Sequence, residues 1–360
     1  MTKLLGFASL VSLLICIASV SIANWDIAGP FAVSFFMLCM LVLKRTPAIS
    51  HFAFTCSIFA AVTAALFYPD FFVAIGDFET KVLIIPLLMI IMFGMGTSMS
   101  LSDFSRVAKM PKGVLVGLVC QFSIMPMVGF GLATASGLPP EIAAGIILVG
   151  CSPSGLASNV MAYISGANVA LSLTLTAVST LLAPFITPFY MSLLADQLVP
   201  IDATAMFLSI AKIVILPIIA GLAFNHFFHG KFTVIDKALP KMSMFGIAVI
   251  ITIITALGRD SLLTIGGVLI LAVFVHNVAG YLFGYGAAKL TGMNEKDSRT
   301  IAFEVGMQNS GLASGIALEM GRVASMGLAP AVFGPLMNIT GSSLAAWWRG
   351  KVSKGGGEND

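Results

Sequence analysis

One carboxylate in this sequence lies well inside a membrane-length apolar segment. It belongs to Glu304, which opens the stretch Glu304-Val305-Gly306-Met307-Gln308-Asn309-Ser310-Gly311. A charge buried in hydrocarbon costs at least about 2.5–3.5 kcal/mol, so an acid at this depth indicates a function. Glycines and amides interrupt the apolar pattern around it. We therefore expect an unwound turn that directs backbone carbonyls toward whatever the carboxylate binds.

A second stretch repeats part of the first. Ser154-Gly155-Leu156-Ala157-Ser158 recurs as Ser310-Gly311-Leu312-Ala313-Ser314, 156 residues later (310 − 154). Ser136-Gly137-Leu138 has a counterpart 155 residues later (291 − 136) in Thr291-Gly292-Met293. Pro153 removes a helix donor beside the earlier stretch and should break its helix. Two matches in nearly the same register predict two structural repeats, each with one broken helix, which meet near the bilayer midplane.

The side chains at these breaks have a common chemistry. Hydroxyls, amide oxygens, freed carbonyls and one carboxylate are hard oxygen donors, which suit a hard cation. Helix N-termini at a break favour an anion. The pattern thus indicates a cation together with an organic anion. Two alternatives stay open at this point: Glu304 as a structural carboxylate bonded across helices, and Gln121 as an interhelical hydrogen-bond partner.

Composition places the chain in the membrane. Of its 360 residues, 58% are hydrophobic and 10% are charged, whereas soluble domains carry about 25% charged residues. The five cysteines lie in apolar runs without metal-like spacing, and no P-loop is present. No second acid accompanies Glu304, so we do not expect an enzyme, and nothing in the charge pattern indicates a nucleic-acid partner.

Apolar runs of about 20 residues predict twelve spans. Two precede a ten-span body, and the first of these could be a cleaved signal peptide, although we favour an uncleaved helix. We expect an extra helix pair at 1–50, one five-helix repeat at 51–200, a second at 201–350, and a disordered cytoplasmic tail at 351–360. The predicted spans are Leu4–Ala23, Ile27–Leu43, His51–Phe67, Val82–Ser98, Gly113–Ala135, Ile142–Ile164, Val169–Leu194, Ala203–Phe224, Met242–Leu257, Leu262–Lys289, Ile301–Met320 and Met326–Trp348.

The basic residues set the predicted orientation. With both termini cytoplasmic, fifteen Lys and Arg residues fall inside, three fall outside (Lys81, Arg259 and Arg322), and Lys212 lies within a span. This split follows the positive-inside rule. We therefore expect a multi-pass protein of the cell (inner) membrane.

Four longer motifs carry a family resemblance: Gln121–Pro126, Cys151–Met161, Asn168–Ser172 and Glu304–Gly311. Over roughly residues 50–350 the sequence resembles the bile acid:sodium symporter family. The resemblance implies an all-α polytopic membrane protein whose ten-helix body consists of two inverted five-helix repeats, divided into panel and core domains. It also implies two crossing discontinuous helices, which correspond here to 142–164 and 301–320.

The resemblance further implies site residues. One sodium ion is expected at Ser158, Asn159, Ser172, Thr176 and Glu304. A second is expected at Gln121, Glu304 and Gln308, with the backbone carbonyls of Val305 and Met307. Leu156, Asn309 and Asn338 match positions that line the family's substrate cavity. Leu156 stands where relatives often have a small or hydroxylated residue, and Met337 where they can carry His, so the departures concern the substrate rather than the ions.

These observations predict a sodium-coupled symporter that imports an organic anion by alternating access. The cargo class includes bile acids and smaller carboxylates such as pantoate. Two other functions are compatible with the same residues. One is a proton-coupled organic anion transporter with Glu304 as the proton carrier, and the other is a membrane sensor that only binds its ligand.

Overall fold

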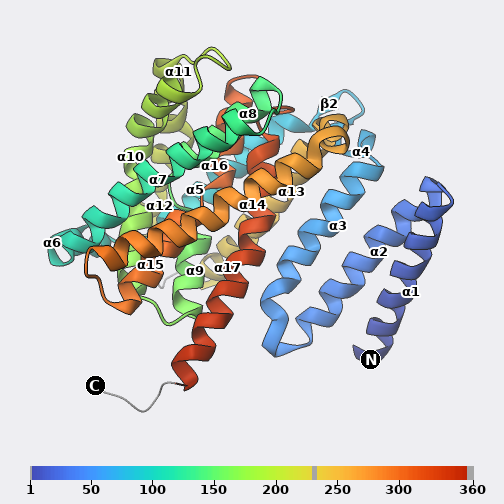
Figure 1. Ribbon diagram of the computed structural model, residues 1–360, viewed down its shortest axis with the longest axis horizontal. Helices are drawn as coiled ribbons and strands as arrows, with labels where there is room; N and C mark the ends of the chain where they lie inside the picture. The colour runs from blue at the N-terminus through green and yellow to red at the C-terminus, as the bar shows by residue number, and fades with distance from the viewer. Residues whose placement is uncertain (1, 229–232, 355–360) are drawn as a thin grey trace.

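The protein is a bundle of helices. The computed structural model describes residues 2–228 and 233–354 (Figure 1). The two short strands, β1 (Ala74–Ile75) and β2 (Phe78–Glu79), form one small hairpin. The longer helices are α1 (Thr2–Ser21), α2 (Trp25–Lys44), α3 (Ala53–Phe67), α5 (Ile84–Thr97), α7 (Pro111–Ala135), α8 (Pro140–Cys151), α10 (Val169–Leu194), α12 (Leu216–Phe228), α13 (Thr233–Leu257), α14 (Arg259–Leu290), α15 (Glu295–Gly306), α16 (Ser310–Glu319) and α17 (Leu328–Lys354).

Short elements connect these helices. They comprise η1 (Pro47–Phe52), α4 (Asp70–Val73), η2 (Thr80–Leu83), α6 (Leu101–Lys109), α9 (Ala157–Ile164), α11 (Ala203–Ile210) and a π-helical turn at Ala211–Ile215 that joins α11 to α12.

Seven helical segments of the described residues are long and apolar enough to cross a membrane. They are Thr2–Ser21, Trp25–Lys44, Thr80–Thr97, Pro111–Ala135, Val169–Leu194, Ala203–Phe228 and Arg259–Leu290. The other five of the twelve predicted spans differ for identifiable reasons. Two are divided by breaks, two correspond to the shorter apolar helices Ala53–Phe67 and Lys241–Leu257, and the last corresponds to α17. The chain is a multi-pass helical protein, as its composition predicts.

Both predicted helix breaks are present. α8 ends at Cys151, Ser152 is extended, and α9 begins at Ala157. Pro153 cannot donate a helical hydrogen bond, which explains the position of this break. α15 ends at Gly306, Met307 is extended, and α16 begins at Ser310. The two breaks meet in an antiparallel bridge between Ser154 and Gln308.

Main-chain hydrogen bonds join the two breaks directly. Gly155 N donates to Met307 O over 2.9 Å, and Asn309 N donates to Pro153 O over 2.8 Å. This close approach needs glycine: a Cβ on Gly155 would lie 2.8 Å from Gln308 O. The crossing is therefore a short piece of two-stranded backbone pairing inside a helical bundle.

The helix boundaries repeat along the chain. α8 and α15 begin 155 residues apart (295 − 140) and end 155 residues apart (306 − 151). The turns that follow matching helices contain left-handed glycines at the same interval: Gly137 with Gly292, and Gly166 with Gly321. Only glycine adopts these positive φ angles without strain. The interval first seen in the sequence is thus also present in the backbone conformation.

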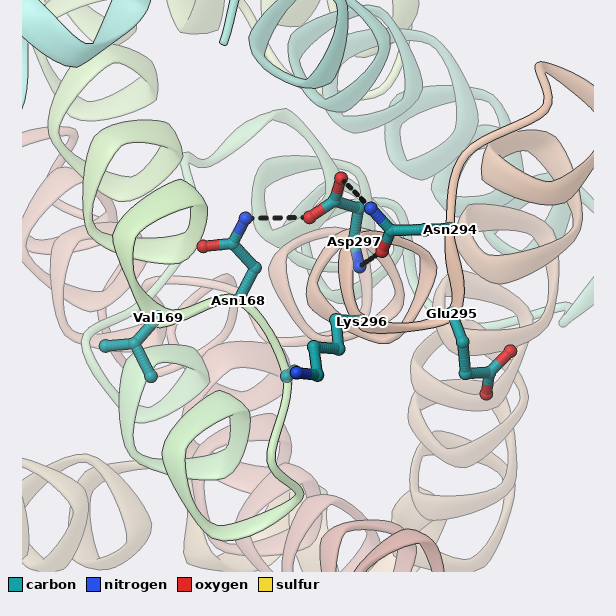
Figure 2. A pocket seen from close by; sticks show the side chains of 7 residues that line it. Asn168, Val169, Asn294, Glu295, Lys296 and Asp297 are labelled. Carbon is teal, nitrogen blue, oxygen red and sulfur yellow. Dashed lines mark hydrogen bonds between the residues drawn. The ribbon is translucent and has the colours of Figure 1, made fainter. Parts of the chain in front are cut away.

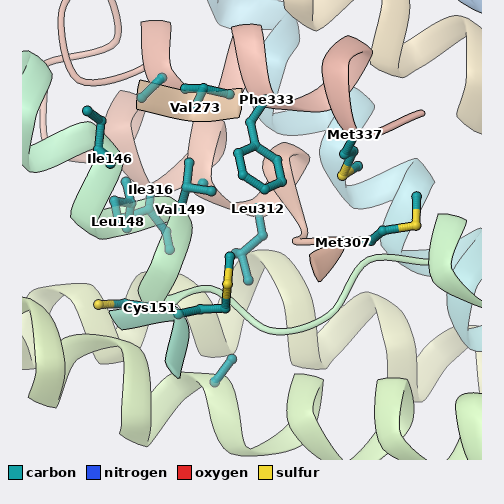
Figure 3. Close-up of a cluster of buried hydrophobic side chains, with 14 of the residues drawn as sticks. Ile146, Leu148, Val149, Cys151, Val273, Met307, Leu312, Ile316, Phe333 and Met337 are labelled. Carbon is teal, nitrogen blue, oxygen red and sulfur yellow. The ribbon is translucent and has the colours of Figure 1, made fainter. Parts of the chain in front are cut away.

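Apolar side chains fill the space beside the crossing. Ile146 and Val149 of α8, Leu312 and Ile316 of α16 and Phe333 of α17 belong to one buried cluster (Figure 3). In a membrane, association of helices depends on such close packing because lipid is as apolar as the side chains. The cluster fixes the half-helices that carry the polar site.

The N-terminal hairpin lies at one edge of the molecule (Figure 1). α1 presents buried Ser9, Ser12 and Ser19, and Ser9 Oγ lies 3.1 Å from Cys39 Sγ of α2. α2 packs against α3, where a Cβ on Gly29 would lie 2.7 Å from the Phe67 ring.

The tail expected at 351–360 begins within α17, which continues to Lys354, and its last residues, 355–360, lie outside the described part of the chain.

Candidate functional site

The Glu304 carboxylate lies at the centre of a cluster of hydroxyl groups. Glu304 is on the last turn of α15 and only 1% exposed. Its Oε1 accepts from Ser158 Oγ over 2.6 Å and from Ser172 Oγ over 2.5 Å. Its Oε2 accepts from Thr176 Oγ1 over 2.9 Å. Residues from α9, α10 and α15 thus converge on one carboxylate.

The same hydroxyls also lie against other acceptors. Asn159 Oδ1 is 2.8 Å from Ser172 Oγ and 3.3 Å from Thr176 Oγ1. Ser158 Oγ is 2.8 Å from Gly155 O. Each hydroxyl has one proton, so the three protons face six close oxygen–oxygen contacts. Half of these contacts therefore lack a proton, and the cluster is rich in oxygen lone pairs that a cation could use.

A second polar group lies between α7 and the α15–α16 break. Gln121 Nε2 donates to Gln308 Oε1 over 2.7 Å and to Ser152 O over 2.8 Å. Gln308 Nε2 donates to Val305 O over 2.6 Å. The structure therefore brings together Gln121, Val305 and Gln308. Met307 O belongs to the crossing, where it accepts from Gly155 N.

Glu304 connects the two groups through its main chain rather than its carboxylate. Ser154 Oγ donates to Glu304 O over 2.7 Å, and Ser154 pairs with Gln308 in the bridge. In the described part of the chain, the hydrogen bonds to the carboxylate come from Ser158, Ser172 and Thr176. The first expected ligand set is thus assembled around the charge, and the second lies beside it.

Two side chains satisfy carbonyls that the breaks leave free, and a third supports one of them. Thr187 Oγ1 donates to Cys151 O over 2.7 Å, and Asn277 Nδ2 donates to Gly306 O over 2.8 Å. Thr340 Oγ1 in turn donates to Asn277 Oδ1 over 2.5 Å. A buried carbonyl without a partner is costly, so these residues stabilise the breaks. Sequence reasoning placed none of the three in the predicted ion or substrate sites, although a polar residue within an apolar span was a usable signal.

The amino-acid sequence matches a known family of transporters. A model described as the sodium bile acid symporter family matches residues 85–265. An "Uncharacterized sodium-dependent transporter YocS" of Bacillus subtilis (strain 168) is 42% identical over 310 residues, covering 85% of this chain and 94% of that protein.

The chain belongs to the sodium bile acid symporter family.

Plant members of the sodium bile acid symporter family are also similar. The "Probable sodium/metabolite cotransporter BASS1, chloroplastic" of Arabidopsis thaliana is 36% identical over 267 residues, covering 74% of this chain and 67% of that protein. The corresponding BASS2 protein of Oryza sativa subsp. japonica is 38% identical over 265 residues, covering 72% of this chain and 62% of that protein. This is a family of sodium-dependent transporters, which agrees with the expectation of a non-enzyme and implies sodium use.

The three residues expected to line the family's substrate cavity occupy different elements. Leu156 is half-buried immediately before α9. Asn309 is buried, and its Oδ1 accepts from Leu312 N over 3.0 Å, so it caps α16. Asn338 is half-buried on α17 and donates to Gly334 O over 2.8 Å. Hydrogen bonding among the described residues does not link these three side chains to one another.

Proposed function

We propose that the protein is a sodium-coupled secondary symporter that imports an organic anion by alternating access. The observation that carries this proposal is the cluster of oxygens around Glu304, where three hydroxyl protons face six close contacts. Hard oxygen donors around a buried carboxylate favour a hard monovalent cation. Bound sodium would supply the missing positive charge at a site that is 1% exposed.

Two sodium ions are proposed. The first ion's ligands are Ser158, Asn159, Ser172, Thr176 and Glu304. The second ion's ligands are Gln121, Glu304 and Gln308 with the carbonyls of Val305 and Met307. Support for the pair of sites is that each polar group is buried and lies at the crossing, so two ions and one carboxylate would share a small volume. The Glu304 carboxylate lies in the first group, and its main-chain carbonyl accepts from Ser154 beside the second, so the shared charge of the two ions is part of the proposal.

The architecture proposed for transport is a ten-helix body of two inverted five-helix repeats, 51–200 and 201–350, arranged as panel and core domains. The 155-residue interval between α8 and α15 supports it, as do the paired left-handed glycines. α8 and α15 enter the crossing from opposite sides of the molecule (Figure 1). Transport would then move the core, with its crossing helices, against the panel.

The proposed location is the cell (inner) membrane, with both termini in the cytoplasm. The distribution of Lys and Arg supports it, and so does the placement of the start of α1 and the end of α17 on one side of the molecule (Figure 1). The extra pair α1 and α2 has no assigned part in transport, and both would span the membrane beside α3.

The proposed cargo is an organic anion of the bile acid or smaller carboxylate class, such as pantoate. The names of the relatives, which include sodium/metabolite cotransporters, support a small metabolite. The starts of α9 and α16 lie at the crossing, and helix N-termini favour anions. Leu156, Asn309 and Asn338 are the proposed lining residues.

Uptake by proteoliposomes with an inward sodium gradient tests this function. Glu304→Ala and the volume-conserving Glu304→Gln should abolish sodium-dependent uptake, since both ions lose their shared charge. Glu319→Gln is the matched control, because Glu319 is exposed at the end of α16 and bonds only to Ser209 among the described residues. Wild-type rates from both Glu304 variants, or uptake undiminished when choline replaces sodium at fixed pH, would refute sodium coupling.

A further inference from the structure

Oxygen-bearing side chains form a ladder between α10 and α15, with rungs about one helical turn apart. On α15 the members recur at intervals of three and four residues, and at the start of α10 they recur at intervals of four. Both spacings keep side chains on one helix face. The members are Asp297, Thr300 and Glu304 on α15, and Asn168, Ser172 and Thr176 on and just before α10.

Hydrogen bonds connect the outer half of this ladder. Asn168 Nδ2 donates to Asp297 Oδ1 over 2.7 Å. One turn further in, Asn168 N donates to Thr300 Oγ1 over 2.9 Å, and Thr300 Oγ1 lies 3.1 Å from Asn168 O. These contacts hold the α9–α10 turn against the first turns of α15. The bond between Asn168 and Asp297 is the outermost of them.

The inner half leads to the proposed ion site. Thr300 is one turn before Glu304 on α15, and both are completely buried or nearly so. Ser172 is one turn after Asn168 and donates to Glu304 Oε1 over 2.5 Å. Oxygen atoms therefore follow one another at intervals of about one helical turn, roughly 5.4 Å, from the protein surface to the carboxylate.

The outer end opens into a surface pocket of about 640 Å3. Two carboxylates and one ammonium line it, from Glu295, Asp297 and Lys296. Figure 2 shows Asp297 between the side-chain amides of Asn168 and Asn294, which donate to its two oxygens over 2.7 and 2.8 Å. Asp297 is thus held by amides rather than by a basic side chain of the described residues, which leaves carboxylate lone pairs at the mouth of the ladder.

The other half of the chain provides an internal comparison. Positions 155 residues from each ladder member are all apolar: Ile142, Gly145 and Val149 on α8, and Val323, Gly327 and Ala331 on the segment leading into α17. A Cβ on Gly145 would lie only 2.3 Å from Met326 O, so the backbones are in contact there. The polar ladder thus leads from Glu304 toward one face of the protein only.

We infer that this ladder is the route by which sodium moves between the Glu304 site and the face where α15 begins, with the Asn168–Asp297 bond as its mouth. The inference rests on the proposed function. A dehydrating cation needs substitute oxygen ligands along its path, and the ladder offers them, whereas the six positions 155 residues away from its members are apolar. Because Lys289, Lys296 and Arg299 mark this face as cytoplasmic in the proposed orientation, the ladder is the release route during import.

Two variants with opposite expected effects test the route. Thr300→Val keeps the side-chain volume but removes the hydroxyl oxygen from the ladder. Sodium-22 exchange across the membrane of proteoliposomes should then slow by about tenfold, which is the scale of losing one buried polar partner. Asn168→Ser keeps an N-cap for α10 but is too short to hold Asp297, and exchange should become faster. A purely structural role for these residues would change both rates in the same direction, which would overturn the route.

The contact between Ser325 and Glu141 supplies a matched control. Ser325 Oγ donates to the Glu141 carboxylate at the start of α8, where no oxygen ladder follows. Ser325→Ala should leave sodium exchange unchanged, and an effect as large as that of Asn168→Ser would count against the route. The sodium concentration that half-saturates thermal stabilisation should stay unchanged in Thr300→Val, because Thr300 does not contact the carboxylate.

A labelling experiment separates the route from transport itself. Thr300→Cys should react with a cationic methanethiosulfonate reagent, and sodium should slow the reaction. Ala302→Cys, equally buried on the same helix, should stay unreactive. Equal labelling of the two cysteines, with sodium-dependent uptake by the wild type still present, would refute the route and leave the proposed function standing. Failure of wild-type uptake would instead refute the proposed function.

Discussion

The hydroxyl of Ser154 donates to the main-chain carbonyl of Glu304 over 2.7 Å, which ties the break of one helix to the last turn of the other. We predict that Ser154→Ala lowers the free energy of unfolding by about 1–3 kcal/mol, because it leaves a buried acceptor unpaired. The melting temperature in detergent measures the effect. Ser343→Ala, an exposed hydroxyl on α17, should change stability by less than about 0.5 kcal/mol. Equal effects of the two changes would contradict the prediction.

Gly306 is predicted to be sterically essential. A Cβ at this position would lie 2.2 Å from a ring carbon of Tyr281, and overpacking of this kind costs about 1–3 kcal/mol. Gly306→Ala should therefore lower the melting temperature and the yield of folded protein. Gly286→Ala on α14 meets nothing within 4 Å and should be neutral or slightly stabilising. A Gly306→Ala protein as stable as wild type would show that the α14–α15 contact relaxes at no cost.

Removal of sodium should lower the melting temperature of the wild-type protein. A ligand that binds only the folded state at a hundredfold excess over its Kd stabilises by about 2.7 kcal/mol. Thermal unfolding in sodium chloride and in choline chloride at equal ionic strength measures this difference. Ser172→Ala removes a hydroxyl that contacts Glu304 and should reduce the difference. If sodium stabilised this variant as strongly as wild type, Ser172 would not be an ion ligand.

Gln121→Leu should change how steeply transport depends on sodium. It removes the amide that bonds to Gln308 and to Ser152 O, so the second proposed ion loses its support while the hydroxyl cluster remains. The Hill coefficient for sodium should fall from nearly two toward about one, since that coefficient is limited by the number of sites. Uptake measured over a range of sodium concentrations gives the value, and an unchanged slope would argue against a second ion at this group.

Glu295 gives a pH-dependent contribution to stability at the mouth of the ladder. Burial by itself raises the pKa of this carboxyl, but hydrogen bonds from Lys289, Arg299 and Tyr285 outweigh it and lower the pKa to about 2 from an ordinary 4.5. A lowered pKa means that the contribution is present above pH 4.5 and is lost as the pH falls toward about 2.

Glu295→Gln should therefore destabilise the protein at neutral pH by a small amount, because the carboxylate is 43% exposed and solvent screens it. The difference in melting temperature between wild type and variant should shrink as the pH falls below 4.5. A difference that stayed constant with pH would show that the ion pairs with Lys289 and Arg299 do not contribute.

The sequence was informative where one residue determines local structure. Pro153 marks the first break, and Glu304 stands out because carboxylates are rare in apolar spans. The left-handed glycines at 137 and 292 belong to a repeated tripeptide that the sequence already showed. These features depend on backbone chemistry that each residue carries with it, so they could be predicted without coordinates.

Other features depend on residues that are distant in the chain. Asn168 and Asp297 are separated by 129 positions, and although Asn168 opens one of the family motifs, nothing in the sequence pairs it with Asp297. Thr187 and Asn277 cap carbonyls of other helices, which only the tertiary structure reveals. The predicted spans His51–Phe67 and Met242–Leu257 correspond to the shorter apolar helices Ala53–Phe67 and Lys241–Leu257. Protein neighbours on several sides relax the length and hydrophobicity that lipid contact alone would demand.

The pairing at the helix crossing has an evolutionary consequence. Pro153, Gly155, Met307 and Asn309 hold it through main-chain atoms, which every amino acid possesses apart from the amide hydrogen that proline lacks. Neighbouring side chains such as Leu156 and Asn338 can then be substituted without loss of the main-chain pairing. A lineage could in this way acquire new substrates by changing a few half-buried positions, while the machinery that couples transport to the ion gradient is inherited intact.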